Sequence, residues 1–131
     1  MEVGLTHLLM IALGGGLGSM ARAALSGLVS RHAHPAWGTF VVNVSGGFLI
    51  GVGFGVFMSQ AAPMTPPPLA WEVFAIGLLG GYTTVSSFAL QTLELARGGA
   101  VRAAAVNALG SLLACPLAAA LGIALVALAG G

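Results

Sequence analysis

Long apolar runs, separated by short polar segments, dominate the chain from one end to the other. A helix needs about 20 predominantly apolar residues to cross the hydrocarbon core of a bilayer, which is about 30 Å thick. Four stretches are long and apolar enough, namely residues 5–29, 37–59, 70–96 and 103–129. The pattern predicts an all-α membrane protein with four transmembrane helices.

The segments between these runs are short, and they hold residues that end helices. Residues 30–36 include an arginine, two histidines and a proline, and residues 60–69 contain four of the six prolines. Residues 97–102 form a glycine-containing turn between two arginines. Proline cannot continue a helix, and glycine favours turns. We therefore predict that residues 1–131 form a single four-span membrane domain.

Composition excludes most soluble classes of protein. The chain is 58% hydrophobic and 5% charged, whereas a soluble domain is about 25% charged. Too few polar groups are present to cover a water-facing surface, so a soluble enzyme, a nucleic-acid binder and a disordered tail are excluded. The single Cys115 cannot form an internal disulfide. We expect a multi-pass protein of the cell (inner) membrane, surrounded by the lipid bilayer, with no enzymatic activity and no nucleic-acid partner.

The arginines that flank the spans bear on orientation. Arg31, Arg97 and Arg102 all fall in the first and third connections, which lie on the same side of a four-span protein. The positive-inside rule then favours cytoplasmic first and third connections. Three charges are few, so a mixed orientation stays open.

Small residues recur every four positions and mark faces where helices pack closely. The repeats are Gly14, Gly18, Arg22 and Ser26 in the first span, and Asn43, Gly47, Gly51 and Gly55 in the second. In lipid, glycine lets helix backbones approach one another. The partner helix can belong to the same subunit or to a second one. Because four short helices make a thin bundle, we expect at least a dimer.

One arginine and one asparagine lie within the first two spans. Such residues are expensive in hydrocarbon and are functional candidates. Arg22 lies near the far end of the first span, where it can anchor the helix, cap a helix end or contact a ligand. Asn43 lies well inside the second span, and its amide offers two donor hydrogens and an acceptor oxygen. It can act as interhelical glue or as an ion-binding group.

The third span contains a poor helix-forming sequence near its middle. Gly80 and Gly81 precede Thr83 and Thr84, so adjacent glycines are followed by β-branched residues. We predict that the third helix is broken there. A break leaves carbonyl oxygens without partners, and these are tolerated in a membrane only where protein, water or an ion satisfies them.

The polar groups near the break indicate the kind of ion. Hydroxyl and amide donors are present, but no carboxylate lies near the centre of any span. Cation pores usually carry acidic rings or a carbonyl filter, whereas donors without an acid suit an anion. The edge of an aromatic ring is weakly positive and adds to this preference. The sequence alone therefore favours a small-anion pathway.

Three motifs, in order and at matching spacing, resemble those of the fluoride channels of the Fluc (CrcB) family. They are Gly14-Gly15-Gly16-Leu17-Gly18 with Arg22, then Trp37-Gly38-Thr39 with Val42-Asn43-Val44-Ser45-Gly46-Gly47-Phe48, and then Gly80-Gly81 with Thr83-Thr84, Ser86-Ser87 and Phe88. The resemblance covers nearly the whole chain. It implies a passive fluoride-selective channel that lowers cytoplasmic fluoride.

The resemblance also implies an assembly and a metal ion. The protein would be an antiparallel dual-topology homodimer, in which a second copy of the chain completes two fluoride pores. A structural Na⁺ would lie at the two-fold axis as the cofactor. Its ligands would be the backbone carbonyls of Gly80 and Thr83.

The pore residues carry over one by one, with two departures. By resemblance the pore would be lined by Asn43, Val85, Ser86, Ser87, Phe88 and Ser111. Val85 replaces the first pore phenylalanine of the family, and Asn107 replaces a tyrosine of the fourth helix.

These departures keep other readings open. The chain could be a non-conducting or partner-dependent subunit of a heterodimeric fluoride channel. A small multidrug exporter also has four spans, but it needs a carboxylate in the first span, and residues 5–29 contain none.

Overall fold

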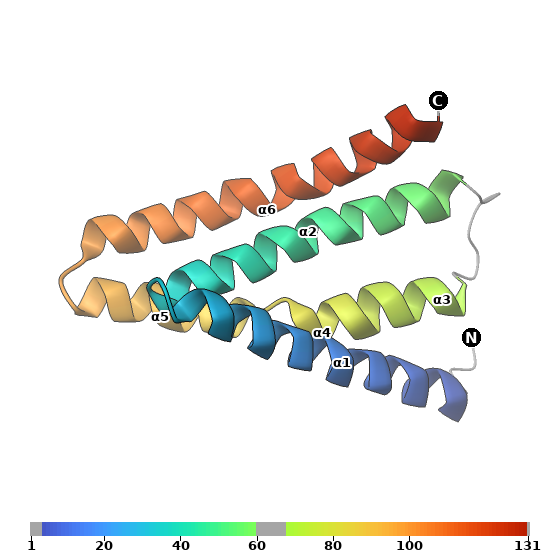
Figure 1. Ribbon diagram of the computed structural model, residues 1–131, viewed down its shortest axis with the longest axis horizontal. Helices are drawn as coiled ribbons and strands as arrows, with labels where there is room; N and C mark the ends of the chain where they lie inside the picture. The colour runs from blue at the N-terminus through green and yellow to red at the C-terminus, as the bar shows by residue number, and fades with distance from the viewer. Residues whose placement is uncertain (1–3, 60–67, 131) are drawn as a thin grey trace.

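Four long helical spans make up the protein. The computed structural model describes residues 4–59 and 68–130. The spans are α1 (Leu5–Ser30), α2 (Pro35–Ser59), a composite third span (Leu69–Arg97) and α6 (Val101–Gly130). They lie side by side along the long axis of the molecule, with both chain ends at the same end (Figure 1). The prediction of four apolar spans is confirmed, with bounds close to those expected.

The connections at the opposite end of the molecule are tight. A turn at residues 31–34 joins α1 to α2, and a second turn joins the third span to α6. Gly99 has a φ of 85°, which a residue with a side chain rarely adopts, so glycine is required in that second turn. Residues 60–67 of the predicted proline-rich connection lie outside the described residues.

The third span consists of four segments. It runs through α3 (Leu69–Trp71), a π-helical segment η1 (Glu72–Leu79), α4 (Gly80–Tyr82) and α5 (Val85–Arg97). Thr83 and Thr84 lie between α4 and α5 with extended backbone, at φ/ψ of −81°/160° and −151°/121°. π-helical turns are rare and are wider than α-helical turns. The backbone therefore departs from a regular α-helix over most of the first half of this span.

The glycine repeats pack helices of this chain against one another. A side chain at Gly18 would collide with the backbone at Leu78, and one at Gly51 would collide with the carbonyl of Ala119. The first-span repeat therefore faces the third span, and the second-span repeat faces α6. Because these contacts lie within one subunit, the second-span repeat does not by itself support a dimer.

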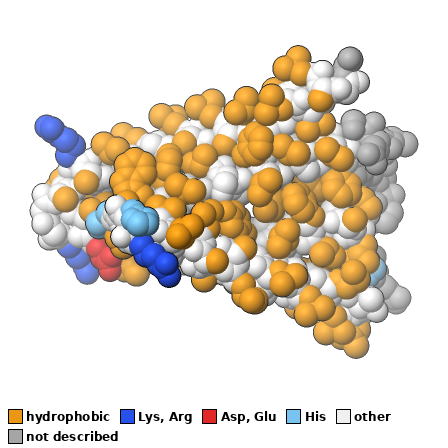
Figure 2. Space-filling model, in the orientation of Figure 1, with side chains coloured by type: hydrophobic (Ala, Val, Ile, Leu, Met, Phe, Trp, Pro, Cys, Tyr) orange, Lys and Arg blue, Asp and Glu red, His pale blue; other side chains and the backbone are white. Residues whose placement is uncertain are grey.

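The buried side chains gather where α2 crosses the third span. Val42, Leu79 and Tyr82 form the core cluster, and Leu25 and Phe74 pack against it. Most other large apolar side chains face outward, so hydrophobic atoms cover most of the visible surface (Figure 2). Charged side chains appear at the end with the two tight turns. This distribution is typical of a protein whose outer face contacts lipid.

Candidate ion pathway at the interrupted third span

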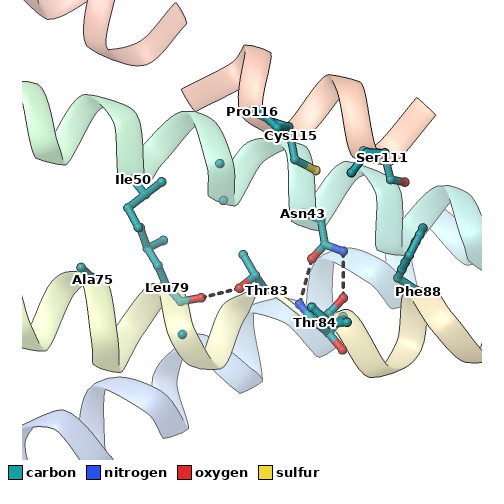
Figure 3. A pocket seen from close by; sticks show the side chains of 15 residues that line it. Asn43, Ile50, Ala75, Leu79, Thr83, Thr84, Phe88, Ser111, Cys115 and Pro116 are labelled. Carbon is teal, nitrogen blue, oxygen red and sulfur yellow. Dashed lines mark hydrogen bonds between the residues drawn. The ribbon is translucent and has the colours of Figure 1, made fainter. Parts of the chain in front are cut away.

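The side-chain amide of Asn43 forms two hydrogen bonds with the extended backbone of Thr84. Asn43 Nδ2 donates to the Thr84 carbonyl at 2.9 Å, and the Thr84 N–H donates to Asn43 Oδ1 at 2.8 Å (Figure 3). The side-chain amide thus bonds both backbone groups of one extended residue, as a residue of a neighbouring β-strand would. A side-chain amide carries both the donor and the acceptor that this pairing needs.

The Thr84 hydroxyl starts the next helix. Thr84 Oγ1 accepts a hydrogen bond from the backbone N–H of Ser87 at 3.2 Å, which caps the first turn of α5. It also donates to Ser87 Oγ at 3.2 Å and lies 3.2 Å from Ser86 Oγ. The two predicted pore serines are therefore joined through Thr84. The sequence offered a signal for the capping role of Thr84, because threonine before an amphipathic helix is a common N-cap.

Side chains of α1 bond the carbonyls on the other side of the interruption. Arg22 Nη1 donates to the Thr83 carbonyl at 3.2 Å, and Ser19 Oγ donates to the Gly81 carbonyl at 3.3 Å. Arg22 is half-buried, and the Arg22 backbone carbonyl accepts a hydrogen bond from Ser26 Oγ at 2.7 Å. Of the roles considered for Arg22, the geometry is that of a cap on a helix end, because its guanidinium bonds a carbonyl where α4 ends.

A groove of about 580 Å³ opens beside the interruption, between α2, the third span and α6. Its polar groups come from Asn43, Thr83, Thr84 and Ser111, and the rest of its wall is largely apolar. Figure 3 shows Ser111 and Cys115 on α6 across the groove from the Asn43–Thr84 pair, with Phe88 at one end. A few donors on an apolar wall can orient a small ligand.

The structure brings some of the predicted site residues together and separates others. Those on the groove wall are Gly80, Thr83, Asn43, Val85, Phe88 and Ser111. Ser86 and Ser87 are not on the groove wall, but their hydroxyls bond that of Thr84, which is. Val85 is 80% exposed, so most of its side chain projects away from the chain. Sequence reasoning missed the buried bond between Ser45 Oγ and Tyr82 Oη, 2.8 Å long, for which the pattern gave no signal.

Asn107 lies apart from the groove. Its Nδ2 donates to Thr92 Oγ1 at 2.8 Å, and that hydroxyl donates to the Phe88 carbonyl at 2.7 Å. Asn107 also lines a smaller cavity of about 260 Å³, next to His34 and Trp37. It therefore joins α6 to α5 behind Phe88.

The carbonyls of Gly80 and Thr83 are the groups that could hold a monovalent cation. The N–H of Thr84, which in an α-helix would bond the Gly80 carbonyl, is bonded to Asn43 Oδ1 instead. Unwound carbonyls are suitable ligands for Na⁺, so the Gly80 oxygen fits this role. The Thr83 oxygen fits it less freely, because it already accepts from Arg22.

Comparison with known proteins identifies the family. The model of the family described as CrcB-like protein, Camphor Resistance (CrcB), matches residues 9–123. The chain belongs to the CrcB family. The resemblance stated above is thereby confirmed.

Individual CrcB relatives match along most of their length. The chain is 50% identical to "Fluoride-specific ion channel FluC 2" of Rhodopseudomonas palustris (strain BisB18) over 126 residues, which cover 89% of this chain and 90% of the relative. It is 48% identical to "Fluoride-specific ion channel FluC" of Opitutus terrae over 116 residues, or 87% of each chain. A protein of Brucella suis, "Fluoride-specific ion channel FluC 3", is 44% identical over 116 residues, or 87% of this chain and 86% of the relative.

Proposed function

We propose that this chain forms a passive, fluoride-selective channel that lowers cytoplasmic fluoride. The observation that supports this most strongly is its 50% identity, over nearly its whole length, to a protein named as a fluoride-specific ion channel. The CrcB family is a family of ion channels, so the chain is not an enzyme. Its four apolar spans make it a multi-pass membrane protein, for which we propose the cell inner membrane.

The groove supplies the groups that fluoride needs. Fluoride is small and strongly hydrated, so a pore must replace its water shell with placed donors. Thr84 uses one amide hydrogen of Asn43, and the second hydrogen is left for the ion. We assign further donors to Ser111 on the groove wall and to Ser86 and Ser87, which bond the Thr84 hydroxyl next to it, and a weakly positive ring edge to Phe88. Flow follows the fluoride gradient and the membrane potential, without ATP or proton coupling.

A second, antiparallel copy of the chain completes the pore in this proposal. The half-buried amide of Asn43 lies on the wall of a groove that opens on a surface otherwise facing lipid, and polar groups that face lipid are costly. Val85 and Leu112, which line the groove, are 80% and 68% exposed and offer an apolar surface to a partner. Dual topology lets both copies present the same groove. A bound Na⁺, held by the Gly80 and Thr83 carbonyls of both copies, would neutralise the partial negative charge of these oxygens.

One specific observation supports an alternative. Position 85 carries an exposed valine, so each groove of a homodimer would hold fewer aromatic rings than the family resemblance implies. The chain could therefore need a different subunit that supplies the ring, or be non-conducting by itself. A small multidrug exporter is disfavoured, because α1 contains no carboxylate.

The decisive experiment is fluoride efflux from liposomes that contain this chain alone. The vesicles are loaded with potassium fluoride, and valinomycin is added so that K⁺ balances the charge. We expect fluoride release from these vesicles, no chloride release from matched chloride-loaded vesicles, and neither from protein-free vesicles. Absence of fluoride release would favour the partner-dependent alternative, and equal release of chloride would refute fluoride selectivity.

A further inference from the structure

The structure places a permanent positive charge next to one carbonyl oxygen of the interruption, that of Thr83. Arg22 Nη1 lies 3.2 Å from the Thr83 oxygen, and the Arg22 side chain is half-buried. Among the described residues, no carboxylate lies within ion-pair distance of this guanidinium. The charge is therefore balanced by the carbonyl dipole and not by an acid.

The neighbouring carbonyls are bonded by neutral groups. The Gly81 carbonyl accepts from the hydroxyl of Ser19, and the Thr84 carbonyl accepts from the amide of Asn43. Of these three oxygens, only that of Thr83 accepts from a charged donor. Hydrogen bonds from charged donors are in general stronger than those from neutral ones, and of the three oxygens only that of Thr83 lies next to a full positive charge.

This oxygen is also one of the two that we assign to Na⁺ under the proposed function. A metal ion bound to it would lie near the guanidinium. At an effective dielectric of about 20, two unit charges about 4 Å apart repel strongly enough to change a binding constant by tenfold or more. The guanidinium and the metal ion therefore oppose each other at one atom.

We propose that Arg22 competes with Na⁺ for the Thr83 carbonyl and so sets the affinity of the Na⁺ site. Without Na⁺, the guanidinium holds the end of α4 in place. With Na⁺, the arginine has to share or release this oxygen, and its charge weakens the binding of the metal. This inference rests on the Na⁺ site of the proposed function, but not on fluoride conduction.

The test is a Na⁺ titration of thermal stability. Purified wild-type protein and the variants Arg22→Gln, Arg22→Lys and Arg31→Gln are heated in detergent at increasing NaCl. N-methyl-D-glucamine chloride keeps the ionic strength constant. Arg31→Gln is the matched control, because it removes the same charge from the exposed turn after α1. A ligand that binds only the folded state raises stability with the logarithm of its concentration above its Kd, so each titration gives an apparent affinity.

We expect the Na⁺ concentration at half-effect to fall by at least about tenfold in Arg22→Gln. Arg31→Gln and Arg22→Lys should stay close to the wild type, because the first leaves the site intact and the second keeps the charge. If Arg22→Gln does not stay folded without Na⁺, the proposal requires NaCl to rescue it and N-methyl-D-glucamine chloride to fail. Rescue by neither salt would overturn the proposal.

Two other results would also overturn the competition, with different consequences for the proposed function. Equal Na⁺ dependence in the wild type and Arg22→Gln would refute the competition but would still support the Na⁺ site. No Na⁺ dependence in any of the four proteins would remove both the competition and the Na⁺ site. Fluoride efflux, measured separately, decides whether the chain conducts.

Discussion

The two halves of the third span differ in packing and in chemistry. Before the interruption, Gly77 is buried against α1, and a side chain there would come within 2.8 Å of the Ile11 carbonyl. After it, α5 has no fully buried residue along its described length, and its Val85 side chain and Phe88 ring border the groove. The first half fixes the position of the backbone, whereas the polar groups of the groove lie at the junction, on Thr83 and Thr84, and on α2 and α6.

The junction between the halves depends on helices that are distant in sequence. Side chains from α1 and α2 bond the carbonyls of Gly81, Thr83 and Thr84. Unsatisfied backbone groups are expensive in a membrane, so these bonds allow the α-helix to stop at Tyr82 and resume at Val85. Close packing therefore positions the backbone of the third span, whereas side-chain hydrogen bonds satisfy its carbonyls at the interruption. Mutations should affect these two features independently.

The largest effect is expected at the packed half. In Gly18→Val, the new side chain meets backbone atoms, with the Leu78 carbonyl carbon and the Tyr82 nitrogen both 2.9 Å from an added Cβ. Because backbone cannot move aside cheaply, we expect a loss of about 3 kcal/mol or more, and no folded protein on size-exclusion chromatography. Gly16→Val is the control, since an added Cβ there has open space. Equal behaviour of the two variants would contradict the packing of α1 on the third span.

A smaller effect is expected at the junction. In Asn43→Asp, the carboxylate keeps the acceptor for the Thr84 N–H but loses the donor to the Thr84 carbonyl. An unsatisfied carbonyl costs about 1–3 kcal/mol, and the thermal unfolding temperature should fall accordingly. We expect fluoride efflux to fall by about tenfold or more, because the anion would also meet a negative charge. The control is Leu49→Ala, which truncates an exposed side chain of the same helix. Fluoride efflux at the wild-type rate in Asn43→Asp would show that Asn43 takes no part in the pore.

The smallest effect is expected at the groove wall of the second half. In Phe88→Ile, the fold should persist while the ring edge is lost, and contacts in which such an edge meets another aromatic ring are worth about 0.5–1.5 kcal/mol. Fluoride efflux should therefore fall by roughly two- to tenfold at unchanged unfolding temperature. Leu90→Ile makes a matched change at an exposed position of the same helix. If both variants conduct like the wild type, the ring edge takes no part in conduction.

Much of the architecture was predictable from local sequence. The lengths of the apolar runs gave four spans near their observed bounds, and the motifs around Asn43 and Phe88 identified the CrcB family. Adjacent glycines and threonines lie where the structure has extended backbone at Thr83 and Thr84. These features depend on neighbouring residues or on hydrophobicity, so the order of amino acids alone determines them.

The tertiary structure decided which groups meet. Asn43 and Thr84 are 41 positions apart, and Arg22 and Thr83 are 61 apart, so no local pattern could pair them. The glycine repeats showed that some helices pack closely, but only the arrangement of the spans showed that they pack within one subunit. Asn107 bonds Thr92 and not the groove for the same reason. A sequence fixes how each segment interacts with the bilayer, whereas the rotation and depth of neighbouring helices fix which polar atoms come within bonding distance.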